Sequence, residues 1–117
     1  MPGPAAEDRW TTVCRYDDIV PDTGVCALVD GRQVAVFRLG DDGGRVFAIA
    51  NFDPASQASV LSRGLVGSLG ERIVVASPIY KHHYDLRTGE CLEESGYSVD
   101  AFAARVVDGD VMVRLNA

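Results

Sequence analysis

Cysteine and histidine are scarce in this chain of 117 residues, which contains three cysteines and two histidines. Cys14, Cys26 and Cys91 are odd in number, and no two of them form a Cys-x-x-Cys pair. A secreted scaffold held by disulfides would favour an even set, so a reduced, cytoplasmic compartment is expected. We expect Cys14 and Cys26 to be buried as small hydrophobic side chains, and Cys91, which follows a turn, to be more exposed.

The sequence also lacks long hydrophobic runs and an excess of basic side chains. No apolar run approaches the roughly 20 residues that a membrane helix needs, and residues 1–8 lack the charged and apolar regions of a signal peptide. The 11 basic and 17 acidic residues give a net charge of -6, and Lys81 is the single lysine. Nucleic acids and anionic membranes attract basic surfaces, so the sequence predicts neither as a partner.

Short runs of β-branched and aromatic residues, separated by turn residues, fill most of the chain. Asp30-Gly31 separates the runs 24–29 and 32–39, and Asp108-Gly109 separates two further runs near the end. An Asp-Gly pair between such runs favours a two-residue β-hairpin turn. A further turn is expected at 41–44. The pattern predicts an all-β fold, a small antiparallel sandwich or barrel.

The length allows one domain, and the ends of a domain are the segments that are most often disordered. We therefore predict a disordered tail over 1–8 and a single domain over 9–117. Residues 111–115 alternate with the period of a strand, which places Val111, Val113 and Leu115 on one face and Met112 and Arg114 on the other. The one helical signal lies in 53–62, where Asp53 would cap a short helical turn.

Nucleotide and metal motifs have little support. The glycines between residues 64 and 70 are spaced by three and match neither GxGxxG nor a P-loop pattern. His82 and His83 are adjacent, and neighbouring side chains of a strand point to opposite faces, so they are unsuited to sharing one metal ion. His83 with Asp85 would form an incomplete site, because zinc takes three or four protein ligands.

Two segments resemble the cluster-binding loops of Rieske [2Fe–2S] domains. Residues 77–91 (SPIYKHHYDLRTGEC) are similar to the second loop, whose family pattern is Cys-Pro-x-His followed by Phe/Tyr-Asp-Leu-x-Thr-Gly. Residues 51–64 (NFDPASQASVLSRG) are similar to the first loop, which contains Cys-x-His and ends in Leu-Ser-x-Gly. The resemblance implies a Rieske-like fold from Trp10 onward, in which these loops form the cluster-binding subdomain.

The residues that would ligate a cluster are different in this chain. Ser77 and Tyr80 stand at the Cys and His positions of the second loop, and residues 53–56 include neither Cys nor His. A Rieske centre needs two cysteine and two histidine ligands, and a hydroxyl cannot replace a thiolate. We therefore expect a degenerate subdomain without a cluster, a metal ion or catalytic residues. Its degenerate positions are Asp53, Pro54, Ala55, Ser56, Ser77 and Tyr80.

Further segments resemble the small subunit of assimilatory NAD(P)H-dependent nitrite reductase, a Rieske-like chain that lacks the cluster ligands. They are 10–14 (W-x-x-V-C), 31–38 (G-x-x-V-A-V-F-R), Asp53-Pro54 with 61–67 (L-S-R-G-x-V-G), 77–81 (S-P-x-Y-K) and 85–92 (D-L-x-T-G-x-C-L). The resemblance implies that nitrite is reduced to ammonium on a large subunit that carries FAD, an Fe–S cluster and sirohaem. This chain would be an accessory subunit that binds the large subunit, holds no cofactor and is non-catalytic in isolation.

The resemblance also implies where the large subunit would bind. In cluster-bearing relatives the two loops form an exposed tip that faces the redox partner. The candidate contact residues at or beside this tip are Phe52, Arg63, Ile79, Tyr80, Lys81 and His82. Alternatively, Phe52 and Tyr80 fill the volume that a cluster would occupy.

Three other functions stay open at this point. The chain could be a cluster-less Rieske-like binding or structural module of another multi-subunit oxidoreductase. It could be a Rieske-type ferredoxin of a ring-hydroxylating dioxygenase, which the missing ligands disfavour. It could also be a small metal or hydrolytic enzyme that uses His82, His83 or Cys91, with Ser77 or Cys91 as a nucleophile beside His82.

Overall fold

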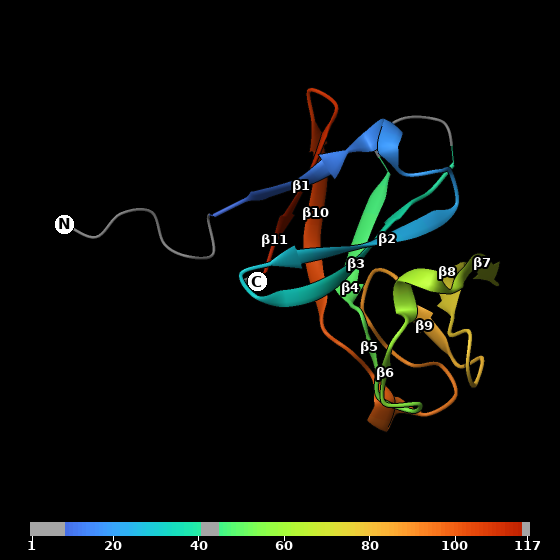
Figure 1. Cartoon of the computed structure of the whole chain (residues 1–117). Coiled ribbons are helices and arrows are strands. Elements are labelled where there is room, and N and C mark those ends of the chain that lie inside the picture. Colours follow the sequence, from blue (N-terminus) through green and yellow to red (C-terminus); the bar gives the residue numbers. More distant parts are fainter. Residues whose placement is uncertain (1–8, 41–44, 116–117) are drawn as a thin grey trace.

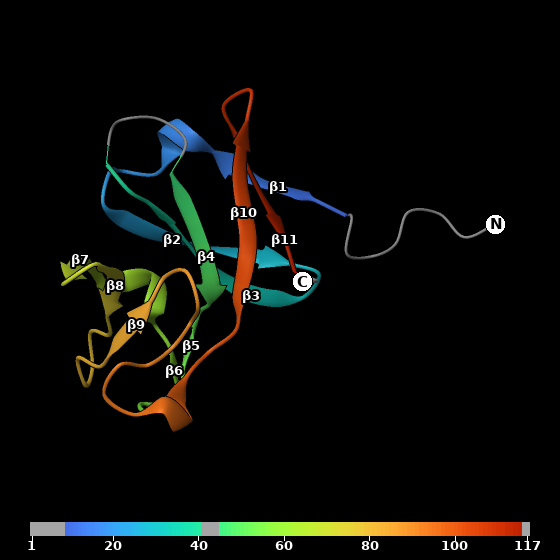
Figure 2. The same ribbon diagram turned by 180° about the vertical axis from the view of Figure 1, so that it is seen from behind.

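The computed structural model describes residues 9–40 and 45–115, and its larger part is an antiparallel barrel (Figures 1 and 2). The barrel strands are β1 (Thr11–Arg15), β2 (Thr23–Val29), β3 (Arg32–Arg38), β4 (Val46–Ala50), β10 (Ala101–Val107) and β11 (Asp110–Arg114). They pair in the order β1-β11-β10-β4-β3-β2, and the edge strands β1 and β2 contact each other. The sheet is therefore nearly closed. The tail predicted over 1–8 and the turn predicted at 41–44 lie outside the described residues.

Between β4 and β10 the chain leaves the barrel and forms a smaller insertion lobe of short hairpins (Figure 1). One hairpin pairs β5 (Phe52–Asp53) with β6 (Ala58–Ser59), and a second sheet contains β7 (Leu65–Leu69), β8 (Arg72–Ala76) and β9 (His83–Asp85). Three short 3-10 helices, η2 (Tyr16–Asp18), η3 (Leu61–Arg63) and η4 (Ser95–Tyr97), connect strands. Within the described residues no helix is long and apolar enough to cross a membrane. The predicted all-β, antiparallel architecture is confirmed, and the insertion lobe contains both segments that resemble cluster-binding loops.

The two Asp-Gly pairs form the hairpin turns that the sequence predicts. Asp30 and Gly31 have φ of 48° and 80°, and Asp108 and Gly109 have φ of 51° and 83°. Two consecutive residues with positive φ define the type I′ turn, whose twist matches that of the flanking strands. These turns set the registers of β2 with β3 and of β10 with β11.

Strand β3 is buried on both of its faces. Val34 and Val36 point into the barrel core, whereas Ala35 and Phe37 pack against the insertion lobe. This double burial explains why residues 33–38 show only weak alternation of apolar and polar residues. Val111 and Val113, which share a face of β11 as predicted, are fully buried in the barrel core. The second core, which joins barrel and lobe, includes Ile49 of β4 with Leu61, Val75, Tyr84, Leu86 and Cys91 of the lobe.

The single helical turn predicted within 53–62 forms at the start of this segment, where the amide of Gln57 bonds to the carbonyl of Asp53 four residues earlier. Residues 54–57 form the turn of the β5–β6 hairpin, and a 3-10 helix begins only at Leu61. Asp53 does act as a cap, because its Oδ1 accepts the amide of Ala55 at 3.1 Å. Gln57, with φ of 57°, then turns the chain back, and its amide donates to the carbonyl of Asp53 at 2.7 Å. A left-handed residue at this point ends any helix that Pro54 could begin.

Two of the three cysteine predictions are wrong. Cys26 is exposed, because on β2 the neighbours Val25 and Ala27 take the face that packs against the barrel core. Cys91 is buried in the core between barrel and lobe. Cys14 is partly buried, and burial together with the carboxylate of Asp18 raises the pKa of its thiol.

Candidate functional site

Asp53 joins the two loops that correspond to the cluster-binding loops. The side chain is fully buried at the end of β5. Its Oδ2 accepts hydrogen bonds from the Ser77 hydroxyl and, at 2.8 Å, from the Ser56 hydroxyl. Its Oδ1 accepts the Tyr84 hydroxyl at 2.7 Å and the amide of Ala55 at 3.1 Å. One carboxylate therefore links the β5–β6 hairpin to the loop after β8 and to β9.

The four donors keep this buried carboxylate charged. Burial alone would raise the pKa of Asp53, but the hydrogen bonds from Ser77, Tyr84, Ser56 and the Ala55 amide together outweigh it and lower the pKa. In turn, burial and the hydrogen bond to Asp53 raise the pKa of Tyr84 far above its ordinary value. Tyr84 is thus a proton donor at every physiological pH, and Asp53 is an acceptor.

The lowered pKa of Asp53 predicts a loss of stability in acid. The unfolded chain binds a proton at the ordinary carboxyl pKa of 3.8, which is above the pKa of the folded state. The contribution of Asp53 to the free energy of unfolding is therefore complete above about pH 5 and decreases as the pH falls through the folded-state pKa. Urea unfolding at several pH values measures this slope. An Asp53→Asn variant should show a shallower acid slope, and an unchanged slope would contradict the assignment.

The contact between Asp53 and Ser77 brings the two loop segments together. In a Rieske centre the two cysteines share one iron, so their side chains converge. Ser77 is at the Cys position of the second loop, and of residues 53–56 it is Asp53 and Ser56 whose side chains reach the same point. The segment 53–56 and Ser77 therefore meet at one place between the two loops.

These positions do not fit a [2Fe–2S] cluster. They offer a carboxylate at Asp53, a methyl group at Ala55, a hydroxyl at Ser77 and a phenol at Tyr80, where thiolates and imidazoles are required. Within residues 9–40 and 45–115, no cluster of three or more His, Cys, Asp or Glu side chains could hold a metal ion. Cys14 and Cys26 lie outside the two loops, and Cys91, the last residue of the second, is not at a ligand position.

The histidines have separate environments. His83 Nδ1 lies 2.5 Å from Oε2 of Glu93, and the amide of His83 donates to Oε1 of the same side chain at 2.7 Å. Asp85 instead accepts the amides of Arg87 and Thr88 and lies 3.8 Å from Arg72. The weakly supported His83–Asp85 site is therefore not assembled. The Ser77 hydroxyl is likewise committed to Asp53.

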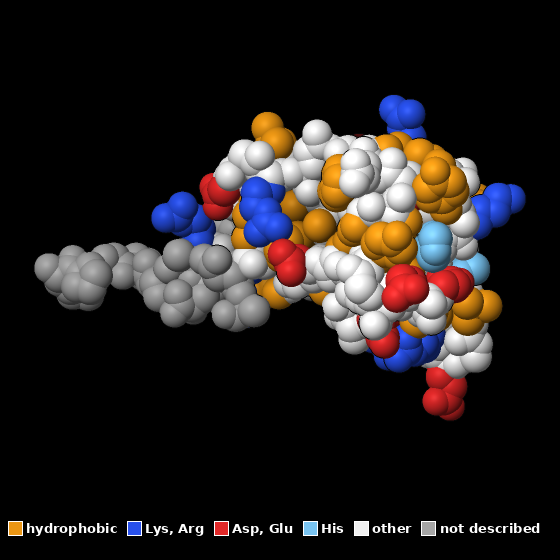
Figure 3. Space-filling model, turned by 90° about the horizontal axis from the view of Figure 1, so that it is seen from below, with side chains coloured by type: hydrophobic (Ala, Val, Ile, Leu, Met, Phe, Trp, Pro, Cys, Tyr) orange, Lys and Arg blue, Asp and Glu red, His pale blue; other side chains and the backbone are white. Residues whose placement is uncertain are grey.

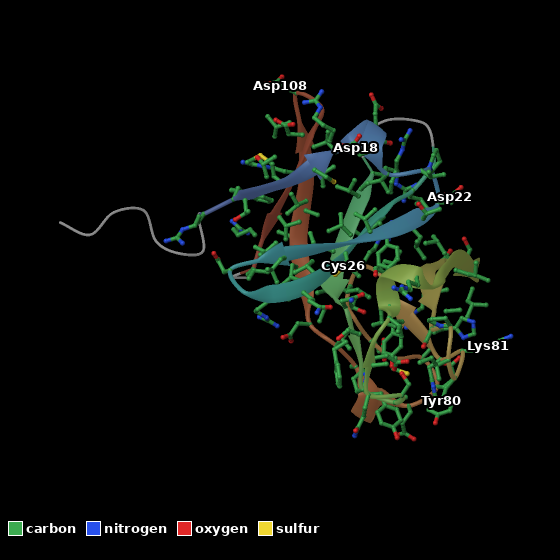
Figure 4. All side chains as sticks on the ribbon, in the orientation of Figure 1. Asp18, Asp22, Cys26, Tyr80, Lys81 and Asp108 are labelled. Atoms are coloured by element: carbon green, nitrogen blue, oxygen red, sulfur yellow. The ribbon has the colours of Figure 1, made fainter. Side chains whose placement is uncertain are left out.

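Four of the predicted contact residues lie on one loop of the lobe. Ile79 and Tyr80 are 47% and 62% exposed, and Lys81 beside them is exposed with φ of 59° (Figure 4). The loop is closed by two backbone hydrogen bonds, from Ser77 N to His82 O at 2.9 Å and from Lys81 N to Ser77 O at 3.0 Å. We call residues 77–82 the knuckle loop.

Aromatic rings extend this exposed end of the lobe. The His82 ring is half-buried and packs edge-on with Tyr80 and with Tyr97 of η4, at 6.5 and 5.7 Å between ring centroids. Phe52 of β5 is 47% exposed. Seen from below, hydrophobic side chains lie around the two histidines at this end of the molecule (Figure 3). Arg63 is exposed on η3, an element that packs against β2 and β3.

The exposure of these rings argues against the alternative that they replace the volume of a cluster. Phe52 is about half exposed and Tyr80 is mostly exposed, and the two loops meet through the Asp53 hydrogen-bond network. The sequence did not reveal the part played by Tyr84, or the contact of Tyr97 with His82. Tyr84 lies in the Tyr-Asp-Leu motif, where the family accepts Phe or Tyr, so the motif carries no signal for the hydroxyl.

Comparisons with known proteins agree with this fold. A model of the Rieske-like [2Fe-2S] domain matches residues 9–114. The nitrite reductase (NADH) small subunit of Salmonella typhimurium is 48% identical over 106 residues, which cover 91% of this chain and 97% of that protein. The solution structure of the nitrite reductase [NAD(P)H] small subunit from Erwinia carotovora has 50% sequence identity and a TM-score of 0.79, covering 94% of this chain and 84% of that chain.

A large-subunit protein matches as well. The nitrite reductase [NAD(P)H] large subunit of Klebsiella oxytoca is 40% identical over 111 residues, which cover 94% of this chain but 11% of that protein. That protein thus contains, within one polypeptide, a segment similar to nearly the whole of this chain. From the family model and the relatives together, the chain belongs to the small subunits of nitrite reductase (NADH), a family with a Rieske-like domain.

Proposed function

We propose that this chain is the accessory subunit of an NAD(P)H-dependent nitrite reductase and acts by binding the catalytic large subunit. The observation that carries the proposal is the Klebsiella oxytoca large subunit, whose polypeptide includes a segment 40% identical to this chain. The same domain is joined covalently to a large subunit in one protein and is a separate chain in others. We therefore expect the separate chain to bind the large subunit directly. The reaction, nitrite to ammonium, belongs to nitrate assimilation in the cytoplasm.

The chain itself carries no electrons in this proposal. A cluster-free domain is supported by the donor set at Asp53, Ala55, Ser77 and Tyr80, which has no thiolate and no imidazole. The redox groups, FAD, an Fe–S cluster and sirohaem, would then all belong to the large subunit. The isolated small subunit would be non-catalytic.

The knuckle loop and Phe52 are the proposed contact surface. Exposed aromatic side chains supply large contact areas at interfaces and are enriched among the residues that dominate binding. Lys81, the single lysine in a chain of net charge -6, would pair with an acidic group of the large subunit. Arg63 on η3 would add a second basic contact if the interface extends toward β2.

The test mixes this chain with the large subunit of the same enzyme. Binding is measured by calorimetry, and NADH-dependent formation of ammonium from nitrite is measured with and without the chain. We expect a saturable complex and a change in the rate or lifetime of the activity. Iron analysis and visible absorption of the purified chain should show no [2Fe–2S] cluster. Absence of binding, or a stoichiometric cluster, would refute the proposal.

A further inference from the structure

The exposed contact residues of the lobe lie on two short segments that have little regular secondary structure. Phe52 lies on the β5–β6 hairpin, whose strands are two residues each. Ile79, Tyr80 and Lys81 lie on the knuckle loop. An isolated hairpin is marginally stable in water even when it is longer than this one. Something else must hold the two segments in a fixed relation.

The side chain of Asp53 provides that link. It follows Phe52 directly in sequence, and its Oδ2 accepts the hydroxyl of Ser77, the first residue of the knuckle loop. The Ser77 hydroxyl oxygen also accepts the amide of Ile79 at 3.4 Å. The backbone of Ser77 closes the knuckle loop through its bonds to Lys81 and His82. A continuous path of hydrogen bonds thus runs from the β5–β6 hairpin to the residues at the crest of the knuckle loop.

The chemistry of this link is unusual for a purely structural core position. Asp53 is fully buried, and every partner found for it among the described residues is a neutral donor. A buried charge without a cationic partner is costly unless hydrogen bonds compensate it. Apolar packing would hold two loops together with a smaller desolvation cost, but it would allow several relative positions of the loops. A fully satisfied polar network specifies one arrangement.

We propose that Asp53 is a positioning residue, which ties the β5–β6 hairpin to the knuckle loop and so fixes how Phe52, Ile79 and Tyr80 meet the large subunit. Its carboxylate does by hydrogen bonding what metal ligation does between the corresponding loops of a Rieske centre. This inference rests on the proposed function, because the large subunit is its partner. The chain thereby presents a rigid contact surface without a metal ion.

The test compares Asp53→Asn with Asp110→Asn in the full chain. Asn keeps the shape of the side chain but puts an N–H group in place of one acceptor oxygen, which opposes the hydroxyl donors. Asp110 is a matched control, because it pairs with Arg15 at 2.7 Å on the exposed β10–β11 hairpin. That hairpin lies at the opposite end of the molecule from Tyr80 (Figure 4). Binding to the large subunit is measured well below the unfolding temperature, together with hydrogen exchange of the backbone amides.

Asp53→Asn is expected to raise the Kd about tenfold, because the apparent affinity falls with the fraction of molecules that hold the competent arrangement. The amides of Ala55 and Lys81 should lose protection, while those of β3 in the barrel keep theirs. Ser77→Ala, which removes one donor and keeps the carboxylate, should give the same pattern with a smaller change. Asp110→Asn should change neither quantity.

Different failures have different meanings. Loop amides that lose protection while the Kd stays at the wild-type value would overturn the positioning role and leave the proposed function intact. Loops that stay protected in both Asp53→Asn and Ser77→Ala would overturn the link itself. A wild-type chain that does not bind the large subunit would refute the proposed function, and this inference with it. If Asp53→Asn does not fold, Ser77→Ala decides alone.

Discussion

Replacing Gly89 with alanine is expected to lower the free energy of unfolding by about 3 kcal/mol. Gly89 has φ of 80°, and a Cβ on it would overlap the carbonyl oxygen of Val99 and lie 2.9 Å from its carbonyl carbon. Val99 cannot easily move away, because its amide donates to the carbonyl of Gly89 at 2.8 Å. The clash falls on the segment that leads back into β10, so it should loosen the junction of lobe and barrel.

The matched control for this substitution is Gly31→Ala. Gly31 also has φ of 80°, but no atom lies within 4 Å of the place of its Cβ. The control therefore measures the cost of a left-handed alanine alone, about 1 kcal/mol. Urea unfolding at neutral pH compares both variants with the wild type. Equal losses would show that the contact with Val99 has no energetic importance.

The Asp-Leu-x-Thr-Gly segment, residues 85–89, stabilises the fold of the lobe. Oδ1 of Asp85 accepts the amides of Arg87 and Thr88 at 2.7 and 3.2 Å, and Leu86 is buried in the second core. Gly89 then permits the close approach to Val99. None of these interactions involves a cluster ligand. The segment can therefore keep its family pattern in a chain whose Ser77 and Tyr80 have departed from that pattern.

Local signals were enough to predict most of the barrel. The Asp-Gly turns at residues 30–31 and 108–109 depend on neighbouring residues alone, and so does the strand alternation that places Val111 and Val113 on one face. The second core could not be predicted in this way, because it gathers Cys91 with residues of β3, β4 and the lobe that are distant in sequence. Periodicity gives no information about which surface a later element will cover.

The Asp53 network is the part of the candidate site that could least be predicted from the sequence. Its partners Ser77 and Tyr84 are 24 and 31 residues away in the chain. Among the residues 53–56, the sequence showed only what was missing, namely Cys and His. It could not show that the side chain of Asp53 meets that of Ser77. That contact needs the folded chain, since each loop is positioned by a different hairpin.

Replacing Tyr80 with alanine is expected to give the largest effect on binding. The side chain is 62% exposed in the isolated chain, so its removal should leave the free energy of unfolding within about 0.5 kcal/mol of the wild type. If Tyr80 is an anchor of the interface, the Kd for the large subunit should rise about 30-fold, equivalent to about 2 kcal/mol. Leu28→Ala is the control, because Leu28 is also an exposed apolar residue, at 71%, but lies on the barrel strand β2. If the two substitutions change the Kd equally, Tyr80 is not an anchor of the interface.

Substitutions of Lys81 distinguish the contribution of charge to binding from the contribution of side-chain shape in the knuckle loop. Because its φ of 59° suits glycine, Lys81→Gly removes the side chain without straining the backbone. Lys81→Glu reverses the charge at the same position. If an acidic group of the large subunit faces Lys81, Lys81→Gly should weaken binding modestly, Lys81→Glu should weaken it more, and added salt should narrow the difference. Association rates measured at low and high salt distinguish this from a steric effect. If Lys81→Gly and Lys81→Glu weaken binding equally at both salt concentrations, the charge of Lys81 makes no contribution. The loop would then bind through the ring of Tyr80, and Tyr80→Ala alone should reproduce the loss of affinity.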